Sequence, residues 1–83
     1  MAIKLSDVTK IVSKAVSKTG VVPSSGAVQF SGLDDSELSV IVNDIKAKFE
    51  NKGMDVVLSE IKLKDFNSIG GAAKWCFDNQ VKE

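Results

Sequence analysis

The feature that most constrains the fold is a run of apolar residues at helical spacing in the middle of the chain, which predicts a helix buried on one side. These residues are Leu38, Ile41, Val42, Ile45 and Phe49. Carboxylates stand just before the run and lysines lie toward its end, as the helix macrodipole favours. We therefore expect a helix from Asp35 or Ser36 to about Asn51, with Gly53 as its stop.

Apolar residues recur at similar spacing near both ends of the chain. The first set predicts a helix over about residues 6–18, with Ser6 or Asp7 accepting hydrogen bonds from its first N–H groups and Gly20 ending it. The second set predicts a helix from about Ser68, its N-cap, to about residue 80.

The segments between these helices are less regular. A long loop is expected over about residues 21–34, which hold the single proline and two glycines. Its apolar Val28 and Phe30 are expected to pin it to the helices. Residues 54–58 suit a short extended segment, and residues 59–66 suit a helical turn.

This order of elements predicts one all-α domain over residues 1–83, a small helical bundle with a long first connection. Trp75 and Phe77 are expected in or near its core, and Cys76 is expected to be a small buried hydrophobe. Lysines that repeat every four residues in the first helix indicate a solvated face; they are Lys10, Lys14 and Lys18.

The composition excludes several classes of site. The chain has no histidine and one cysteine, so Ser-His-Asp and Cys-His catalysis, zinc clusters and internal disulfides are ruled out. Lysine is the sole basic residue and the formal net charge is zero, which gives no overall attraction to nucleic acid or to acidic membranes. No signal peptide or membrane span is recognisable. We expect a non-enzymatic, cytoplasmic monomer.

What remains is covalent modification of a serine. Ser36 directly follows Asp35 at the expected helix start. A phosphate ester on such a hydroxyl gains from the helix dipole and from unpaired N–H groups. The same position also suits a plain N-cap without function, and this local feature alone favours the plain cap, because serine is common at such positions.

Over nearly its whole length the chain resembles the acyl carrier protein family, which includes peptidyl carriers. Residues 8–12 look like the first helix of the family, and residues 33–38 (Leu-Asp-Asp-Ser-Glu-Leu) look like its Asp-Ser-Leu attachment motif. Residues 45–49 (Ile-Lys-Ala-Lys-Phe) are similar to the end of its second helix. Residues 63–75 are similar to its third turn and fourth helix.

The resemblance implies a four-helix bundle with a short third helix. It implies that a phosphopantetheinyl transferase attaches 4′-phosphopantetheine from coenzyme A to Ser36, with Asp35 as the adjacent motif residue. The thiol of that arm would carry acyl groups as thioesters to partner enzymes of fatty-acid, polyketide or nonribosomal synthesis. The alternative is a carrier-like helical interaction module without a prosthetic group.

The chain departs from the family pattern around the serine. Glu37 follows Ser36 where the family has Leu, Ile or Met, and the distance from Ser36 to Phe49 is one residue short. Alignment backward from Phe49 places Asp35 at the attachment position, and alignment on Leu38 places Glu37 there. We prefer Ser36, because an Asp-Ser pair at the helix start is what the chemistry requires. Lysines replace usual acidic residues later in this helix, which weakens electrostatic steering to generic partners.

Overall fold

The computed structural model describes residues 2–20 and 27–82. Within them the chain is mostly helical. Its elements in order are α1 (Leu5–Ser17), the 3₁₀ turn η1 (Phe30–Gly32), α2 (Asp35–Glu50), β1 (Met54–Val56), α3 (Glu60–Leu63), α4 (Ile69–Asp78) and β2 (Gln80–Lys82). The expectation of an all-α domain is therefore wrong in one respect, because β1 and β2 form a small antiparallel sheet.

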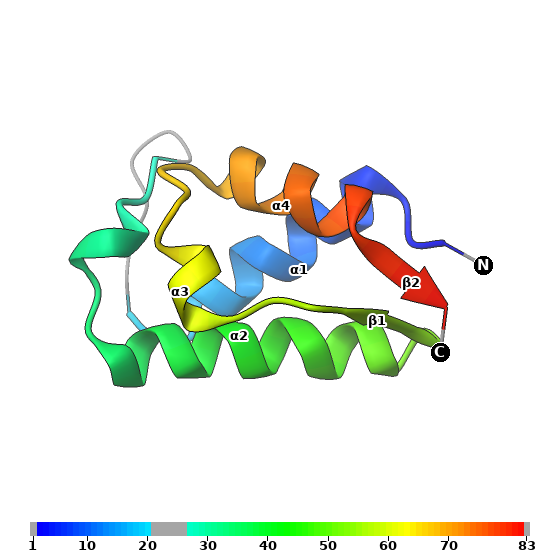
Figure 1. Cartoon of the computed structure of the whole chain (residues 1–83), viewed down its shortest axis with the longest axis horizontal. Coiled ribbons are helices and arrows are strands. Elements are labelled where there is room, and N and C mark those ends of the chain that lie inside the picture. The colour runs from blue at the N-terminus through cyan, green and yellow to red at the C-terminus, as the bar shows by residue number, and fades with distance from the viewer. Residues whose placement is uncertain (1, 21–26, 83) are drawn as a thin grey trace.

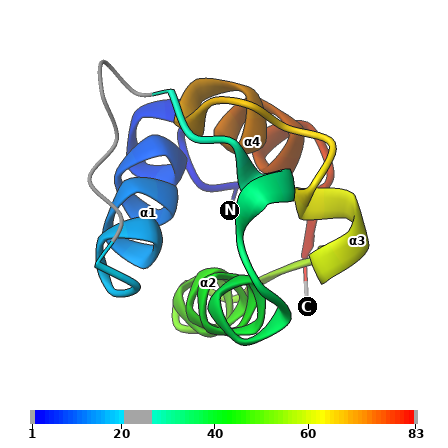
Figure 2. The same ribbon diagram turned by 90° about the vertical axis from the view of Figure 1, so that its left-hand side faces the viewer.

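The three longer helices surround one core (Figure 2). Figure 1 shows α2 along one long side of the molecule and α4 along the other, with the short α3 beside the first half of α2. The sheet lies at the end where α2 finishes. None of the helices in the described ranges is long and apolar enough to cross a membrane.

The core confirms the helical spacing in the sequence. All five apolar residues expected on the inner face of α2 are buried, as are Val8, Ile11, Val12, Ala15 and Val16 of α1. The cluster continues into α4 through Ile69, Ala72, Ala73 and Cys76. Trp75 and Phe77 are partly buried and pack against this cluster, which confirms their expected place near the core.

The connection before α2 is pinned as expected. Val28 and Phe30 are buried, and Phe30 has no exposed surface. The Val28 N–H donates to the carbonyl of Asn67 at 3.1 Å, so the loop is also tied to the start of α4. The remainder of the expected loop, residues 21–26, lies outside the described residues.

The ends of the helices differ in detail from the sequence expectation. The N-cap of α1 is Lys4 without a side-chain hydrogen bond, so the cap expected from Ser6 or Asp7 is wrong. Those residues already lie inside the helix, where their own N–H groups belong to its first turn. Ser68 caps α4 as expected, its hydroxyl oxygen accepting from the Gly71 N–H at 3.0 Å.

The sheet shortens the last helix. α4 ends at Asp78 rather than near residue 80, because Gln80 pairs with Val56 of β1. The Gln80 side-chain amide also accepts from the Ile3 N–H at 2.8 Å and donates to the Ile3 carbonyl at 2.9 Å. The segment before α1 is thereby joined to β2, a contact between residues 77 positions apart.

The structure also shows where the three lysines of the first helix and Cys76 lie. All three lysines are exposed, which confirms the expected solvated face, and Lys18 also forms an ion pair with Asp44 of α2 that links the end of α1 to α2. Cys76 is buried, and burial raises the pKa of its thiol to about 12. The thiol is therefore a packing group in the folded protein.

Candidate functional site

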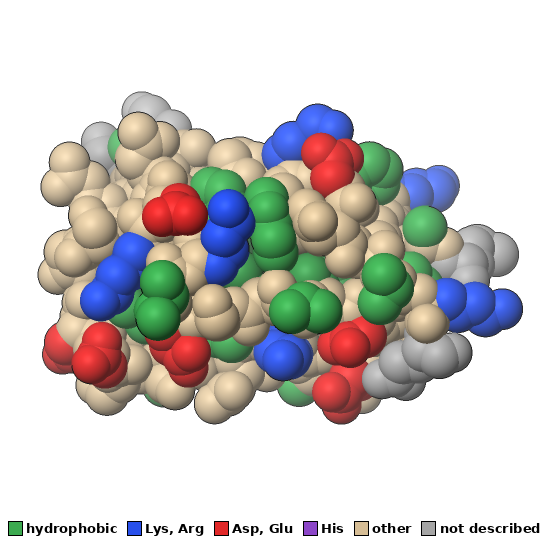
Figure 3. Space-filling view, viewed as in Figure 1, with side chains coloured by type: hydrophobic (Ala, Val, Ile, Leu, Met, Phe, Trp, Pro, Cys, Tyr) green, Lys and Arg blue, Asp and Glu red, His purple; other side chains and the backbone are tan. Residues whose placement is uncertain are grey.

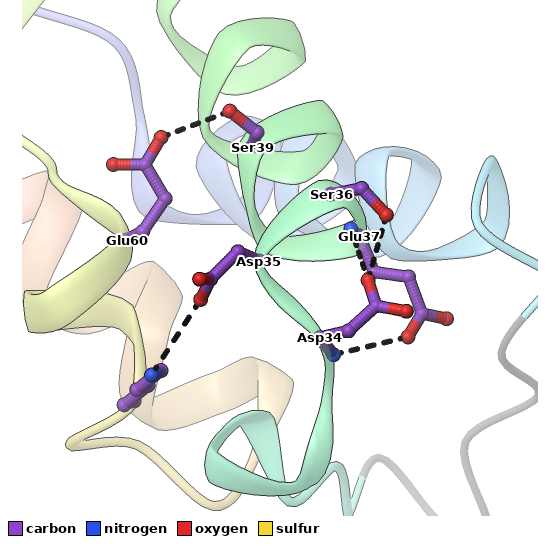
Figure 4. A network of polar contacts seen from close by, with 7 residues as sticks. Asp34, Asp35, Ser36, Glu37, Ser39 and Glu60 are labelled. Carbon is purple, nitrogen blue, oxygen red and sulfur yellow. Dashed lines mark hydrogen bonds and ion pairs between the residues drawn. The ribbon is translucent and has the colours of Figure 1, made fainter.

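The first turn of α2 is organised by a capping box. Asp34 has extended backbone angles (φ −79°, ψ 169°) and is the N-cap. Its Oδ1 accepts from the Glu37 N–H at 2.9 Å, while Glu37 Oε1 accepts from the Asp34 N–H at 3.2 Å (Figure 4). Two N–H groups at the start of α2 are thus satisfied reciprocally.

Ser36 is the second residue of α2 and not its N-cap. The interpretation of Ser36 as a plain N-cap is therefore wrong, because Asp34 already fills that position. The side chain of Ser36 is exposed, and its hydroxyl donates to Asp34 Oδ1 at 2.8 Å. The sequence did contain a signal for the true cap, since Asp34 and Glu37 have the spacing of a capping box.

Asp35 points to the other side of the helix. Its carboxylate extends toward α3, away from the Ser36 hydroxyl (Figure 4). There Asp35 Oδ1 lies 3.8 Å from Lys64 Nζ, and the Asp35 side chain is 94% exposed. Such an exposed ion pair contributes little to stability. The structure thus brings Ser36 together with Asp34 and does not bring it together with the side chain of Asp35.

A second contact joins α3 to α2 beside this turn. The Ser39 hydroxyl donates to Glu60 Oε1 at 3.0 Å. With the pair between Asp35 and Lys64, it places both ends of α3 against the first half of α2. Sequence reasoning did not identify Glu60 or Lys64, because their neighbours on α2 are more than 20 residues away in the chain.

The electrostatics of the turn favour the ionised form of Asp34. The Glu37 backbone N–H and, after it, the Ser36 hydroxyl hold the pKa of the Asp34 carboxyl below its ordinary value. A hydrogen bond to a carboxylate favours its charged form, and the positive end of the helix dipole acts in the same direction.

The Ser36 hydroxyl is the group of this turn that can form an ester. Among the described residues, no group of three or more Asp, Glu or Cys side chains is placed to hold a metal ion. The Ser36 hydroxyl is reachable from solvent, donates to Asp34 and lies in the first turn of a 16-residue helix. Its position is compatible with an ester that bears a phosphate, because the helix N-terminus tolerates negative charge.

Comparisons with known proteins give no further guide to the site. Neither the protein-family models, nor the curated proteins, nor the solved structures contain a match to this chain.

Proposed function

We propose that this chain is an acyl carrier protein in which Ser36 bears 4′-phosphopantetheine. Its arm would hold acyl intermediates as thioesters and deliver them to enzymes of fatty-acid, polyketide or nonribosomal synthesis. The observation that carries the proposal is the exposed Ser36 hydroxyl on the first turn of α2. The resemblance of the sequence to carrier proteins is the reason to propose this hydroxyl as the attachment point of the prosthetic group.

The arrangement of the helices supports the same proposal. α1, α2 and α4 enclose one core, and the short α3 is fastened beside the first half of α2. We interpret this as a carrier-like four-helix bundle with a small added sheet. Ser36 is the residue that would hold the arm, and Asp34, with its N–H-bonded carboxylate, is its nearest charged neighbour.

The test is covalent loading followed by intact-mass measurement. The unmodified protein is incubated with a broad-specificity phosphopantetheinyl transferase, coenzyme A and Mg²⁺. We expect a gain of one phosphopantetheine that is lost in Ser36→Ala. Ser31→Ala is the matched control, because Ser31 is an exposed serine in η1, just before the same helix. If the mass gain were lost in Ser31→Ala and kept in Ser36→Ala, the attachment site would be Ser31 and not Ser36.

A double variant tests the register of the motif. Asp35→Ser combined with Ser36→Ala moves the hydroxyl to the position that alignment from Phe49 would assign. We expect no loading of this variant, because residue 35 faces α3. Loading of the double variant but not of the natural chain would mean that the attachment site has been lost from this protein.

A second function is favoured by a different observation. Three apolar side chains are unusually exposed in α3, in β2 and directly after β1: Ile61 at 80%, Val57 at 76% and Val81 at 52%. Figure 3 shows several groups of apolar side chains on the face of the molecule that is seen in Figure 1. A face with several exposed apolar side chains can serve as an interaction surface. A helical interaction module without a prosthetic group is therefore the alternative, and it is favoured if Ser36 is not loaded under conditions that load a control carrier.

A further inference from the structure

The carboxylate that contacts Ser36 is not the one beside it in the sequence. The Ser36 hydroxyl donates to Asp34 Oδ1 at 2.8 Å, and the same oxygen accepts from the Glu37 N–H at 2.9 Å. The Asp35 carboxylate instead lies 3.8 Å from Lys64 of α3 (Figure 4).

Helix geometry explains why Asp34, rather than the adjacent Asp35, contacts Ser36. Consecutive residues of a helix are rotated by about 100°, so their side chains do not face each other. The side chain of an N-cap residue, in contrast, folds back over the first turn and reaches the second and third helical residues. Asp34 is the N-cap, and Ser36 and Glu37 are those residues.

We propose that Asp34, and not the adjacent Asp35, positions the Ser36 hydroxyl for transfer of phosphopantetheine. This inference rests on the proposed function. In the transfer, Ser36 Oγ forms a bond to the phosphorus of the phosphopantetheine half of coenzyme A. The bond from that phosphorus to the adenosine bisphosphate half breaks, and the leaving oxygen takes the electron pair. The hydroxyl proton passes to a base of the transferase or to water.

Asp34 is a positioning residue in this step and not the base. Its carboxyl has a pKa below the ordinary value, so it accepts a hydrogen bond but retains a proton poorly. Its hydrogen bonds to Ser36 and to the Glu37 N–H fix the direction of the Ser36 O–H bond relative to the helix. A hydroxyl held in one rotamer loses less freedom when it enters the transferase.

The experiment measures kcat/KM for loading of Ser36 in variants that separate capping from positioning. Asp34→Ser keeps a good N-cap residue but removes the carboxylate, Asp34→Ala removes both, and Asp34→Asn keeps a cap and an oxygen acceptor. We expect kcat/KM to fall roughly tenfold or more in Asp34→Ser and Asp34→Ala, the effect of one hydrogen bond to a charged group. Asp34→Asn should recover part of the loss, and Asp35→Ala should lose less than Asp34→Ala, because the Asp35 carboxylate lies near Lys64 and the Ser36 hydroxyl donates to Asp34.

A second readout tests the contact without the transferase. The pKa of Asp34, measured by NMR titration, should rise in Ser36→Ala because a hydrogen-bond donor is lost. It should not change in Ser39→Ala, the next serine of α2, whose hydroxyl bonds to Glu60. An unchanged Asp34 pKa in Ser36→Ala would overturn the contact on which the inference rests.

The outcomes separate this inference from the proposed function. If the natural chain is loaded at Ser36 and Asp34→Ser is loaded equally well, the positioning role is wrong and the carrier function stands. If Asp35→Ala is impaired as much as Asp34→Ala, the role belongs to the adjacent residue and the inference is overturned. If the natural chain is not loaded at all, the carrier function fails and the positioning role fails with it.

Discussion

Replacement of Phe30 by alanine should destabilise the whole domain, although Phe30 lies in a connection and not in a long helix. Its side chain is fully buried. A phenylalanine buries about 200 Å² of side-chain surface, worth about 5 kcal/mol at 25 cal/mol per Å². Alanine recovers part of this and leaves a cavity, so we expect a loss of about 3–5 kcal/mol. That is a large share of the ~4–12 kcal/mol typical of a domain of this size.

The assay is urea unfolding followed by the fluorescence of Trp75, the single tryptophan of the chain. With an m-value near 1–1.5 kcal/mol per M, the midpoint should fall by about 2–5 M, without a change in m. Ser31→Ala, at the exposed neighbouring residue of η1, should shift the midpoint by less than about 0.5 M. A loss below about 1 kcal/mol in Phe30→Ala would refute the conclusion that the connection is part of the core.

The remaining predictions concern glycine, cysteine and pH. Gly53→Ala should lower the free energy of unfolding by about 1 kcal/mol, because Gly53 has φ +74°. Gly70→Ala in α4 should raise it by up to about 1 kcal/mol, because an added Cβ meets no atom within 4 Å there. Urea midpoints measure both changes. The Cys76 thiol, with a pKa of about 12, should resist alkylation at about pH 8 until urea unfolds the chain, and rapid native labelling would contradict its burial. The pKa of Asp34 is lowered in the folded state, so its contribution is fully present above the unfolded pKa of about 3.9 and is lost as the pH falls through the folded pKa. The stability difference between the natural chain and Asp34→Asn should therefore shrink as urea midpoints are measured from about pH 6 down to about pH 2; a constant difference would show that ionisation of Asp34 does not matter.

Local patterns in the sequence were enough to predict the longer helices. The spacing of apolar residues located α1, α2 and α4, and Ser68 and Gly53 marked one start and one stop correctly. The burial of Phe30 and Val28 followed from apolar residues in an otherwise polar connection. These predictions succeed because each depends on residues close together in the chain.

The small sheet could not be predicted in the same way. Residues 54–58 carried a weak extended pattern, but nothing near Gln80 indicated a strand. β2 forms because α4 ends before Gln80, which can then pair with Val56. The side-chain amide of Gln80 also forms hydrogen bonds with the backbone of Ile3. Both partners are distant in sequence, so local propensity carries little information about them.

The sequence by itself determined that a helix starts near Ser36, that its inner face is buried and that the chain contains no histidine. Only the tertiary structure decided which residues of α3 and its C-cap lie beside the first turns of α2. Asp35 is the neighbour of Ser36 along the chain, but helical rotation turns that carboxylate toward Lys64, while the cap folds Asp34 back onto Ser36. Adjacency in sequence sets where a residue stands, whereas the direction of its side chain depends on backbone angles and on elements packed against it.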